Sequence, residues 1–207
     1  MKTIGVTGGV GAGKSTLLAF LEKTYGARVL RCDEIGHDLM EPGGACYGPV
    51  SSLFPAAVKE DGVLNRVVIS QEVFASEEKR EALDAIIHPA VMDVLMTEKK
   101  RQEEKGCPLF VVEAALLFEA GYEKNCDETW AVHVPLEKRI ERLIESRGYT
   151  REKALSIARR QMGEEEFLSR ADRVIENAAT MEEAFSQADG YLMELGIEKK
   201  QDGEERE

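Results

Sequence analysis

The feature that most constrains this chain is a glycine-rich turn at residues 8–15, GGVGAGKS. The turn fits the pattern G-x-x-x-x-G-K-[ST] in full, and Thr16 follows it. The residues before it, 2–7, are typical of a short buried strand, and residues 14–24 are typical of a helix. Glycines let such a turn curl until several backbone N–H groups point at one anion, and the helix N-terminus adds its positive end. The sequence therefore predicts a phosphate-binding loop.

A plain turn and a dinucleotide-binding turn both fit this segment less well. A plain strand-to-helix turn with an exposed lysine does not require all of the fixed positions. A dinucleotide-binding turn needs G-x-G-x-x-G, yet Gly9 and Gly11 are followed by Lys14 where the third glycine should stand. In a phosphate loop, Lys14 bridges the β- and γ-phosphates and the Ser15 hydroxyl ligates Mg²⁺. The residues expected to bind nucleotide here are Gly9, Val10, Gly11, Ala12, Gly13, Lys14, Ser15 and Thr16.

Strand and helix patterns alternate at both ends of the chain. Further short apolar runs occupy 27–32, 109–113, 129–134 and 172–176, so we expect a parallel sheet covered on both faces. The stretch from 33 to 105 carries mostly helix signals and is too long for a plain crossover. Residues 77–104 predict a long helix that Pro89 should kink or split, and 181–196 suit a closing helix.

We therefore predict an α/β P-loop NTPase fold with a five-stranded parallel sheet and helices on both of its faces. The predicted core comprises 1–33, 106–135 and 171–197. A helical substrate-binding insertion is expected over 34–105, a helical lid over 136–170, and a frayed tail over 198–207, which lacks apolar residues.

Charge and composition exclude several classes of protein. The formal net charge is −12, which argues against bulk nucleic-acid binding because a phosphate backbone needs a positive footprint. No apolar run approaches the ~18 residues that cross a bilayer. The four cysteines form no C-x-x-C pair and there are three histidines, so a zinc site is not expected. With no visible signal peptide, we expect a reduced, cytoplasmic protein without membrane or nucleic-acid partners.

Two carboxylates are candidates for catalysis. The chain lacks the N-K-x-D segment of GTPases, and its size favours a small-molecule kinase. Asp33 ends the second expected strand, 19 residues after Lys14, where it could orient an acceptor hydroxyl and take its proton. The alternative, which is compatible, is an N-cap for a helix over 34–40. Glu113 ends the run LFVV, either as a residue that holds Mg²⁺-bound water or as an ordinary glutamate near a loop.

Cations gather in residues 138–173, which carry ten Lys and Arg against seven Asp and Glu. Arg139 and Arg142 are three residues apart and can share one helix face, while Arg147 cannot join both. A lid that brings guanidinium groups onto a triphosphate would stabilise transition-state charge and exclude water. The alternative is a solvated helix laced with ion pairs. His88, in the helical insertion, is a packed core residue, a substrate contact, or both.

Taken together, these residues resemble the dephospho-CoA kinase family, from about residue 3 to 195. Residues 5–15 match G-[LV]-T-G-G-x-G-[SA]-G-K-S, and the family's D-x-D becomes RCD at 31–33, without the first acid. Its P-L-L-[FV]-E becomes ALLFE at 115–119, with alanine for proline. Further matches are E-P-G at 41–43, D-G-x-L-x-R at 61–66, H-P at 88–89, the arginine pattern of the lid at 142–147, and Gln161 followed by A-D-x-[VI]-x-N at 171–177.

The resemblance implies transfer of the ATP γ-phosphoryl group to the 3′-hydroxyl of dephospho-CoA, in a fold like that of adenylate kinase. Mg²⁺ is the implied cofactor, and the protein is expected to be a monomer or a weak homo-oligomer. The implied base is Asp33, and the lid cations are Arg139 or Arg142 together with Arg147. Dephospho-CoA is expected to contact Thr7, Asp33, His88 and Leu116, with Asn177 near the adenine of ATP.

Two alternatives to this function stay open at the level of sequence. One is a P-loop kinase for another nucleotide or small alcohol. A nucleoside monophosphate acceptor would need cations in the insertion, yet residues 35–58 contain no Lys or Arg. The other is a nucleotide-dependent switch that binds ATP without phosphoryl transfer.

Overall fold

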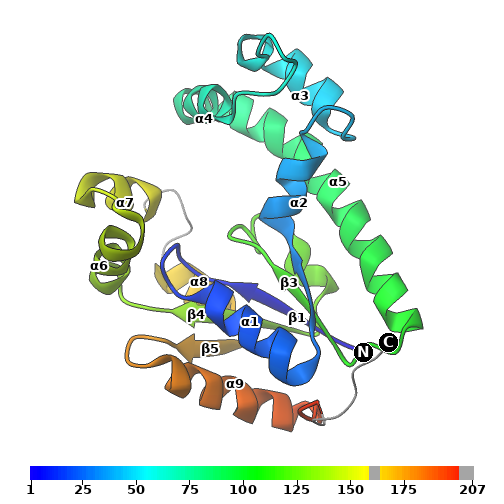
Figure 1. The fold of residues 1–207 in the computed structure, drawn as a ribbon, viewed down its shortest axis with the longest axis vertical. Helices are drawn as coiled ribbons and strands as arrows, with labels where there is room; N and C mark the ends of the chain where they lie inside the picture. Colours follow the sequence, from blue (N-terminus) through cyan, green and yellow to red (C-terminus); the bar gives the residue numbers. More distant parts are fainter. Residues whose placement is uncertain (159–163, 201–207) are drawn as a thin grey trace. The chain divides into compact units, whose positions relative to one another are not determined.

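A computed structural model describes residues 1–158 and 164–200, and its centre is a sheet of five strands in the order β2-β3-β1-β4-β5. The paired strands β1 with β3, β1 with β4, and β4 with β5 run parallel (Figure 1). The predicted five-stranded parallel sheet is confirmed. The strands are β1 (Lys2–Thr7), β2 (Arg28–Arg31), β3 (Leu109–Glu113), β4 (Glu128–His133) and β5 (Arg173–Glu176).

One face of the sheet is covered by α1 (Lys14–Tyr25) and α9 (Met181–Glu194). Alternate residues of the strands point at these helices, as Ile4 and Val6 of β1 and Trp130 and Val132 of β4 do. They meet Leu17, Leu18 and Leu21 from α1 and Ala184, Ala188 and Leu192 from α9. Each fully buried Leu or Ile side chain contributes about 1.5–3 kcal/mol, so this layer fixes the position of α1 beneath the glycine-rich turn.

The opposite face is covered by the chain that follows β3 and by α8 (Glu164–Arg170). A side chain at Gly5 would come within 2.9 Å of Leu117, which shows how closely that segment packs on β1. The Arg170 guanidinium of α8 lies 4.6 Å from the centre of the Phe118 ring. Helices therefore cover both faces, as the sequence predicts.

Residues Arg31–Lys100 form a second compact unit, and Met1–Leu30 with the chain from Arg101 onward form the first. The second unit has its own core, in which Val50, Phe54 and Ile69 are buried. Its helices are α2 (Cys32–Leu39), α3 (Tyr47–Leu53), η1 (Pro55–Ala57), α4 (Arg66–Ala75) and most of α5 (Glu77–Glu104). Within residues 1–158 and 164–200, no helix combines the length and apolar character that crossing a bilayer requires.

The predicted long helix is present, but Pro89 does not split it. α5 is continuous over 28 residues with Pro89 inside it. A proline leaves the carbonyl four residues earlier without its helical donor, here that of Ala85. Both Ala85 and Pro89 are exposed, so water can satisfy that carbonyl and the helix continues.

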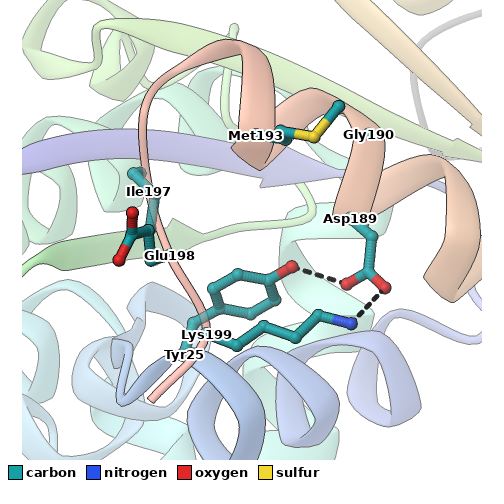
Figure 2. Close-up of a pocket in the computed structure, with 7 residues that line it drawn as sticks. All are labelled: Tyr25, Asp189, Gly190, Met193, Ile197, Glu198 and Lys199. Atoms are coloured by element: carbon teal, nitrogen blue, oxygen red, sulfur yellow. Dashed lines mark hydrogen bonds and ion pairs between the residues drawn. The ribbon is translucent and has the colours of Figure 1, made fainter. Parts of the chain in front are cut away.

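The predicted frayed tail does not begin at residue 198, because residues 198–200 are held against α1. The Lys200 N–H donates to the Thr24 carbonyl at 2.8 Å. Asp189 of α9 accepts hydrogen bonds from the Tyr25 hydroxyl and from Lys199 Nζ, both at 2.6 Å. Figure 2 shows the two contacts of Asp189 beside a pocket of about 410 Å³. Polar contacts therefore order residues 198–200, although the segment has no apolar side chains on which the prediction could rest. Residues 201–207 lie outside the described part of the chain.

Candidate active site

The glycine-rich turn joins the end of β1 to the start of α1. Gly13 caps α1 with φ +89° and ψ +16°, a left-handed backbone conformation that residues other than glycine rarely adopt. Inside the turn, the Ala12 N–H donates to the Gly9 carbonyl at 3.0 Å. Ser15 and Thr16, in the first turn of α1, are exposed. The backbone thus adopts the curled form that a phosphate loop requires.

Lys14 lies between the turn and strand β3. Its Nζ donates to the Gly8 carbonyl at 2.8 Å and lies 3.7 Å from Glu113 Oε1. The register of the sheet explains this, because Glu113 pairs with Val6 near the end of β1. Both side chains are only 12–13% exposed, so water screens their attraction less than at an open surface. The role of Glu113 toward Mg²⁺ stays a prediction.

Arg139 of α6 (Leu136–Arg147) is buried against the turn. Its Nε donates to the Val134 carbonyl at 3.0 Å, and its guanidinium lies so close to Gly9 that a side chain there would meet Nη1 at 1.6 Å. Apolar contacts hold the helix in this place, since Ile140 and Leu143 pack with Val10. The sequence predicts Arg139 as a lid cation, and the structure places it as a packed neighbour of the turn.

The other two arginines of α6 have different surroundings. Arg142 Nη2 donates to the backbone carbonyl of Asn177 at 2.8 Å, just after β5. The Asn177 side chain is fully buried, and its Nδ2 donates to the Ala12 carbonyl at 2.7 Å. Arg147, in the last turn of α6, is exposed. A second helix, α7 (Arg151–Ala158), packs against α6.

A group of basic side chains lies at the turn and at the segment after β5, in a protein of net charge −12. Lys14, Arg139 and Arg142 contribute to it, and so does Lys138, whose Nζ donates to the Ala178 carbonyl. Such a concentration attracts a polyanion that the rest of the surface would repel. The sequence places Lys138 in the basic segment but does not assign it to the site. Nothing in the sequence marks its backbone acceptor, so only the fold shows this contact.

Thr7 and Leu116, two of the four predicted acceptor contacts, belong to the same unit as the turn. Thr7 is buried at the end of β1. Leu116 follows β3 and is half-buried, with its carbonyl accepting from the Ala120 N–H at 2.9 Å.

Asp33 and His88 belong to the second unit. Asp33 is exposed in the first turn of α2, two residues after β2 ends. The N-cap of α2 is Arg31, so the alternative role of Asp33 as an N-cap is wrong. The helix begins at Cys32, two residues earlier than expected, because the apolar strand run does not mark where the backbone turns. His88 Nε2, on α5, lies 3.7 Å from Asp84 Oδ1. Gln161 and two further lid arginines, at 159 and 160, lie outside the described residues.

The model of the dephospho-CoA kinase family matches residues 2–183. A dephospho-CoA kinase of Symbiobacterium thermophilum is 36% identical over 190 residues, which are 91% of this chain and 79% of that protein. The chain belongs to the dephospho-CoA kinase family.

Two solved structures share the fold over most of the chain. A crystal structure from Thermus thermophilus is 38% identical, with a TM-score of 0.82 over 94% of this kinase and 97% of that chain. The dephospho-CoA kinase of Campylobacter jejuni shares the fold, with 20% identity and a TM-score of 0.67 over 94% and 98% of the two chains. The kinase thus has the phosphate-loop fold that the sequence predicts.

Proposed function

We propose that this kinase transfers the γ-phosphoryl group of ATP to the 3′-hydroxyl of dephospho-CoA, giving coenzyme A and ADP. The observation that carries the proposal is a fully formed phosphate loop in a chain that matches the dephospho-CoA kinase family over residues 2–183. The loop accounts for the phosphoryl donor, and the family membership supports the choice of acceptor.

The residues around the loop stabilise the negative charge that develops during phosphoryl transfer. In the transfer, a bond forms between the acceptor oxygen and the γ-phosphorus, and the bond from that phosphorus to the β,γ-bridging oxygen breaks. Negative charge grows on the departing ADP, and Lys14 with the loop N–H groups stabilises it. Arg142 and Arg147 add positive charge from α6. Arg139, buried and bonded to Val134, holds the loop in shape while contributing its charge at short range.

Asp33 takes the proton that the acceptor hydroxyl loses as the new bond forms. A carboxylate suits this role because it accepts hydrogen bonds and can orient the hydroxyl before transfer. The exposure of Asp33 in the first turn of α2 leaves its oxygens accessible to an acceptor. We propose that His88, Thr7 and Leu116 contact dephospho-CoA, and that the insertion over 34–105 binds it.

The residues present fit Mg²⁺ as the ion that accompanies ATP. Ser15 offers an exposed hydroxyl at the start of α1, and Glu113 offers a carboxylate beside Lys14. Mg²⁺ prefers oxygen ligands and keeps several waters and phosphate oxygens, so one or two protein groups are enough. When bound, the ion would neutralise phosphate charge.

The experiment mixes the protein with Mg-ATP and dephospho-CoA and looks by mass spectrometry for one added phosphate on the ribose. Asp33→Asn should keep ATP binding and lower kcat by about 10²–10⁴-fold. Glu34→Gln is the matched control, since it removes a neighbouring exposed carboxylate from the same helical turn. Unchanged transfer by Asp33→Asn, or an equal loss in both variants, would refute Asp33 as the base.

The cellular setting is proposed as well. We infer a cytoplasmic enzyme, monomeric or weakly self-associating, without nucleic-acid or membrane partners. None of the four cysteines, all within the described residues, is in a disulfide, and the net charge is −12. Light scattering of the purified protein and fractionation of cells test these points.

A further inference from the structure

Asn177 occupies an unusual position for a residue expected near a nucleotide base. It follows β5 directly, and its N–H donates to the His133 carbonyl at 2.9 Å, which extends the pairing of β4 and β5. Its side chain has no exposed surface. Instead it lies under the phosphate loop, where a side chain on Gly13 would meet Nδ2 at 2.3 Å. The amide therefore acts on the loop itself.

The contact that Asn177 makes is with the Ala12 carbonyl, at 2.7 Å from Nδ2. In a regular helix this carbonyl would accept from the N–H four residues later, that of Thr16. Here the Thr16 N–H donates to the Gly13 carbonyl at 3.2 Å, as does the Leu17 N–H at 3.3 Å. The left-handed turn at Gly13 thus leaves the Ala12 carbonyl outside the helix, and Asn177 supplies its donor.

Holding that carbonyl also sets the direction of the next N–H. A trans peptide unit is planar, and its C=O and N–H groups point in opposite directions. Fixing the Ala12 carbonyl toward Asn177 therefore turns the Gly13 N–H away from Asn177. We propose that Asn177 is a positioning residue that orients the Gly13 N–H toward the phosphate of the bound nucleotide. The inference rests on the proposed function, because it assumes that the loop binds a triphosphate.

The remaining polar atom of the side chain supports this role. Among the described residues, Asn177 Oδ1 is buried without a hydrogen-bond partner. Exchanging the amide's oxygen and nitrogen would place two oxygens 2.7 Å apart, so the orientation is fixed by the Ala12 carbonyl. A buried acceptor without a partner is unfavourable, which argues that this asparagine serves the geometry of the loop rather than the stability of the fold.

The same residue connects the loop to the lid helix. Its backbone carbonyl accepts from Arg142 Nη2 at 2.8 Å, while its side chain holds Ala12. A displacement of Asn177 would therefore reach both the Gly13 N–H and α6. A contact with adenine, which the resemblance implies for Asn177, would require the covered amide to become accessible. The two roles predict different responses to a ligand that has no base.

The test compares the binding of ATP and of inorganic tripolyphosphate by calorimetry. Asn177→Asp keeps the shape of the side chain but replaces the donor Nδ2 with an oxygen, and Asn177→Ala removes the amide group altogether. In each variant, the affinity for ATP and the affinity for tripolyphosphate should fall by the same factor, about 10–100-fold. The reason is that one oriented N–H donor to a charged phosphate is lost. A loss for ATP alone would assign Asn177 to the base and overturn the proposal, as would unchanged binding of both.

Thr129→Val is the matched control. It removes two hydrogen bonds of a buried threonine in the same sheet, away from the loop: Thr129 Oγ1 donates to Asp172 Oδ2 at 2.8 Å and accepts from the Asp172 N–H at 3.1 Å. It should lower thermal stability and leave tripolyphosphate affinity unchanged. Equal weakening by Thr129→Val would attribute the effect to general destabilisation and overturn the proposal.

A measurement on the wild-type protein covers the case in which the variants do not fold. Tripolyphosphate should slow hydrogen exchange of the Asn177 side-chain amide by closing the loop on it, and unchanged or faster exchange would contradict the proposal. Failure of the proposed function is separate, because it would appear as wild-type protein that binds tripolyphosphate yet transfers no phosphate to dephospho-CoA.

Discussion

Two neighbouring glycines of the phosphate loop should respond differently to the same added methyl group. A Cβ at Gly8 would lie 2.5 Å from the Val132 carbonyl oxygen, and Gly8 has φ +146°. A Cβ at Gly9 would lie 1.6 Å from Nη1 of Arg139. The first obstacle is the backbone of strand β4, which cannot move without breaking the sheet. The second is the tip of a side chain, which can rotate.

The expected magnitudes follow from these contacts. Gly8→Ala combines backbone strain of about 1–3 kcal/mol with overpacking of about 1–3 kcal/mol. At ~2–4 °C per kcal/mol for a chain of this size, the Tm should fall by on the order of 10 °C. Gly9→Ala should displace the Arg139 guanidinium and break the hydrogen bond from Nε to the Val134 carbonyl, which is worth about 1.5–3 kcal/mol.

The assay is thermal unfolding of both variants in the wild-type and Arg139→Ala backgrounds. In the Arg139→Ala background, Gly9→Ala should lower the Tm only slightly, because the guanidinium that it would displace is absent. Gly8→Ala should lower the Tm by the same amount in both backgrounds. The reasoning is refuted if Gly9→Ala is equally destabilising without the guanidinium, or if Gly8→Ala is tolerated.

Three further predictions concern other parts of the chain. Burial first, and then the hydrogen bond to Asp189, raise the pKa of Tyr25 above its ordinary 10.0. The resulting stability is complete below about pH 10 and is lost as the pH rises further, so Tyr25→Phe should flatten this dependence in urea unfolding. Asn65 caps α4 with its side chain, and Asn65→Ala should lower unfolding free energy by about 0.5–2 kcal/mol. Glu113→Gln should raise the Mg²⁺ concentration for half-maximal activity by about 10-fold or more, with little change in Tm.

Each of these has an outcome that contradicts it. If the unfolding free energies of wild-type protein and Tyr25→Phe depend on pH in the same way, the Tyr25 hydroxyl is not the group whose titration lowers stability. An Asn65→Ala variant as stable as wild type would show that α4 does not depend on its cap. Unchanged Mg²⁺ dependence of Glu113→Gln, with Lys14 still in place, would assign that glutamate to the ion pair alone.

Local patterns predict much of this fold. The loop at 8–15 depends on glycines and a lysine within one short segment, so its sequence alone indicates its shape. The strand at 109–113 is a run of apolar residues whose burial decides its structure, and it is found at those bounds. The helix over 77–104 is not split at Pro89. The effect of a proline depends on whether the carbonyl left without a donor faces water, which is a property of the packed helix.

The placement of α6 could not be predicted in the same way. Spacing of three residues puts Arg139 and Arg142 on one helix face; Arg139 lies against the loop, and Arg142 contacts the residue that follows β5. Their partners, however, are the backbone carbonyls of Val134 and Asn177. Because every residue offers such a carbonyl, a sequence holds no signal for which one is used.

The sequence by itself determined that the chain has a phosphate loop on a parallel sheet and belongs to the dephospho-CoA kinase family, because these rest on short-range patterns and on an ordered series of motifs. Only the tertiary structure decided that Asn177 holds the Ala12 carbonyl, 165 positions away. That contact exists because β4 and β5 pair and carry the end of β5 to the loop. Pairing between distant segments is a property of the whole sheet, and no local pattern encodes it.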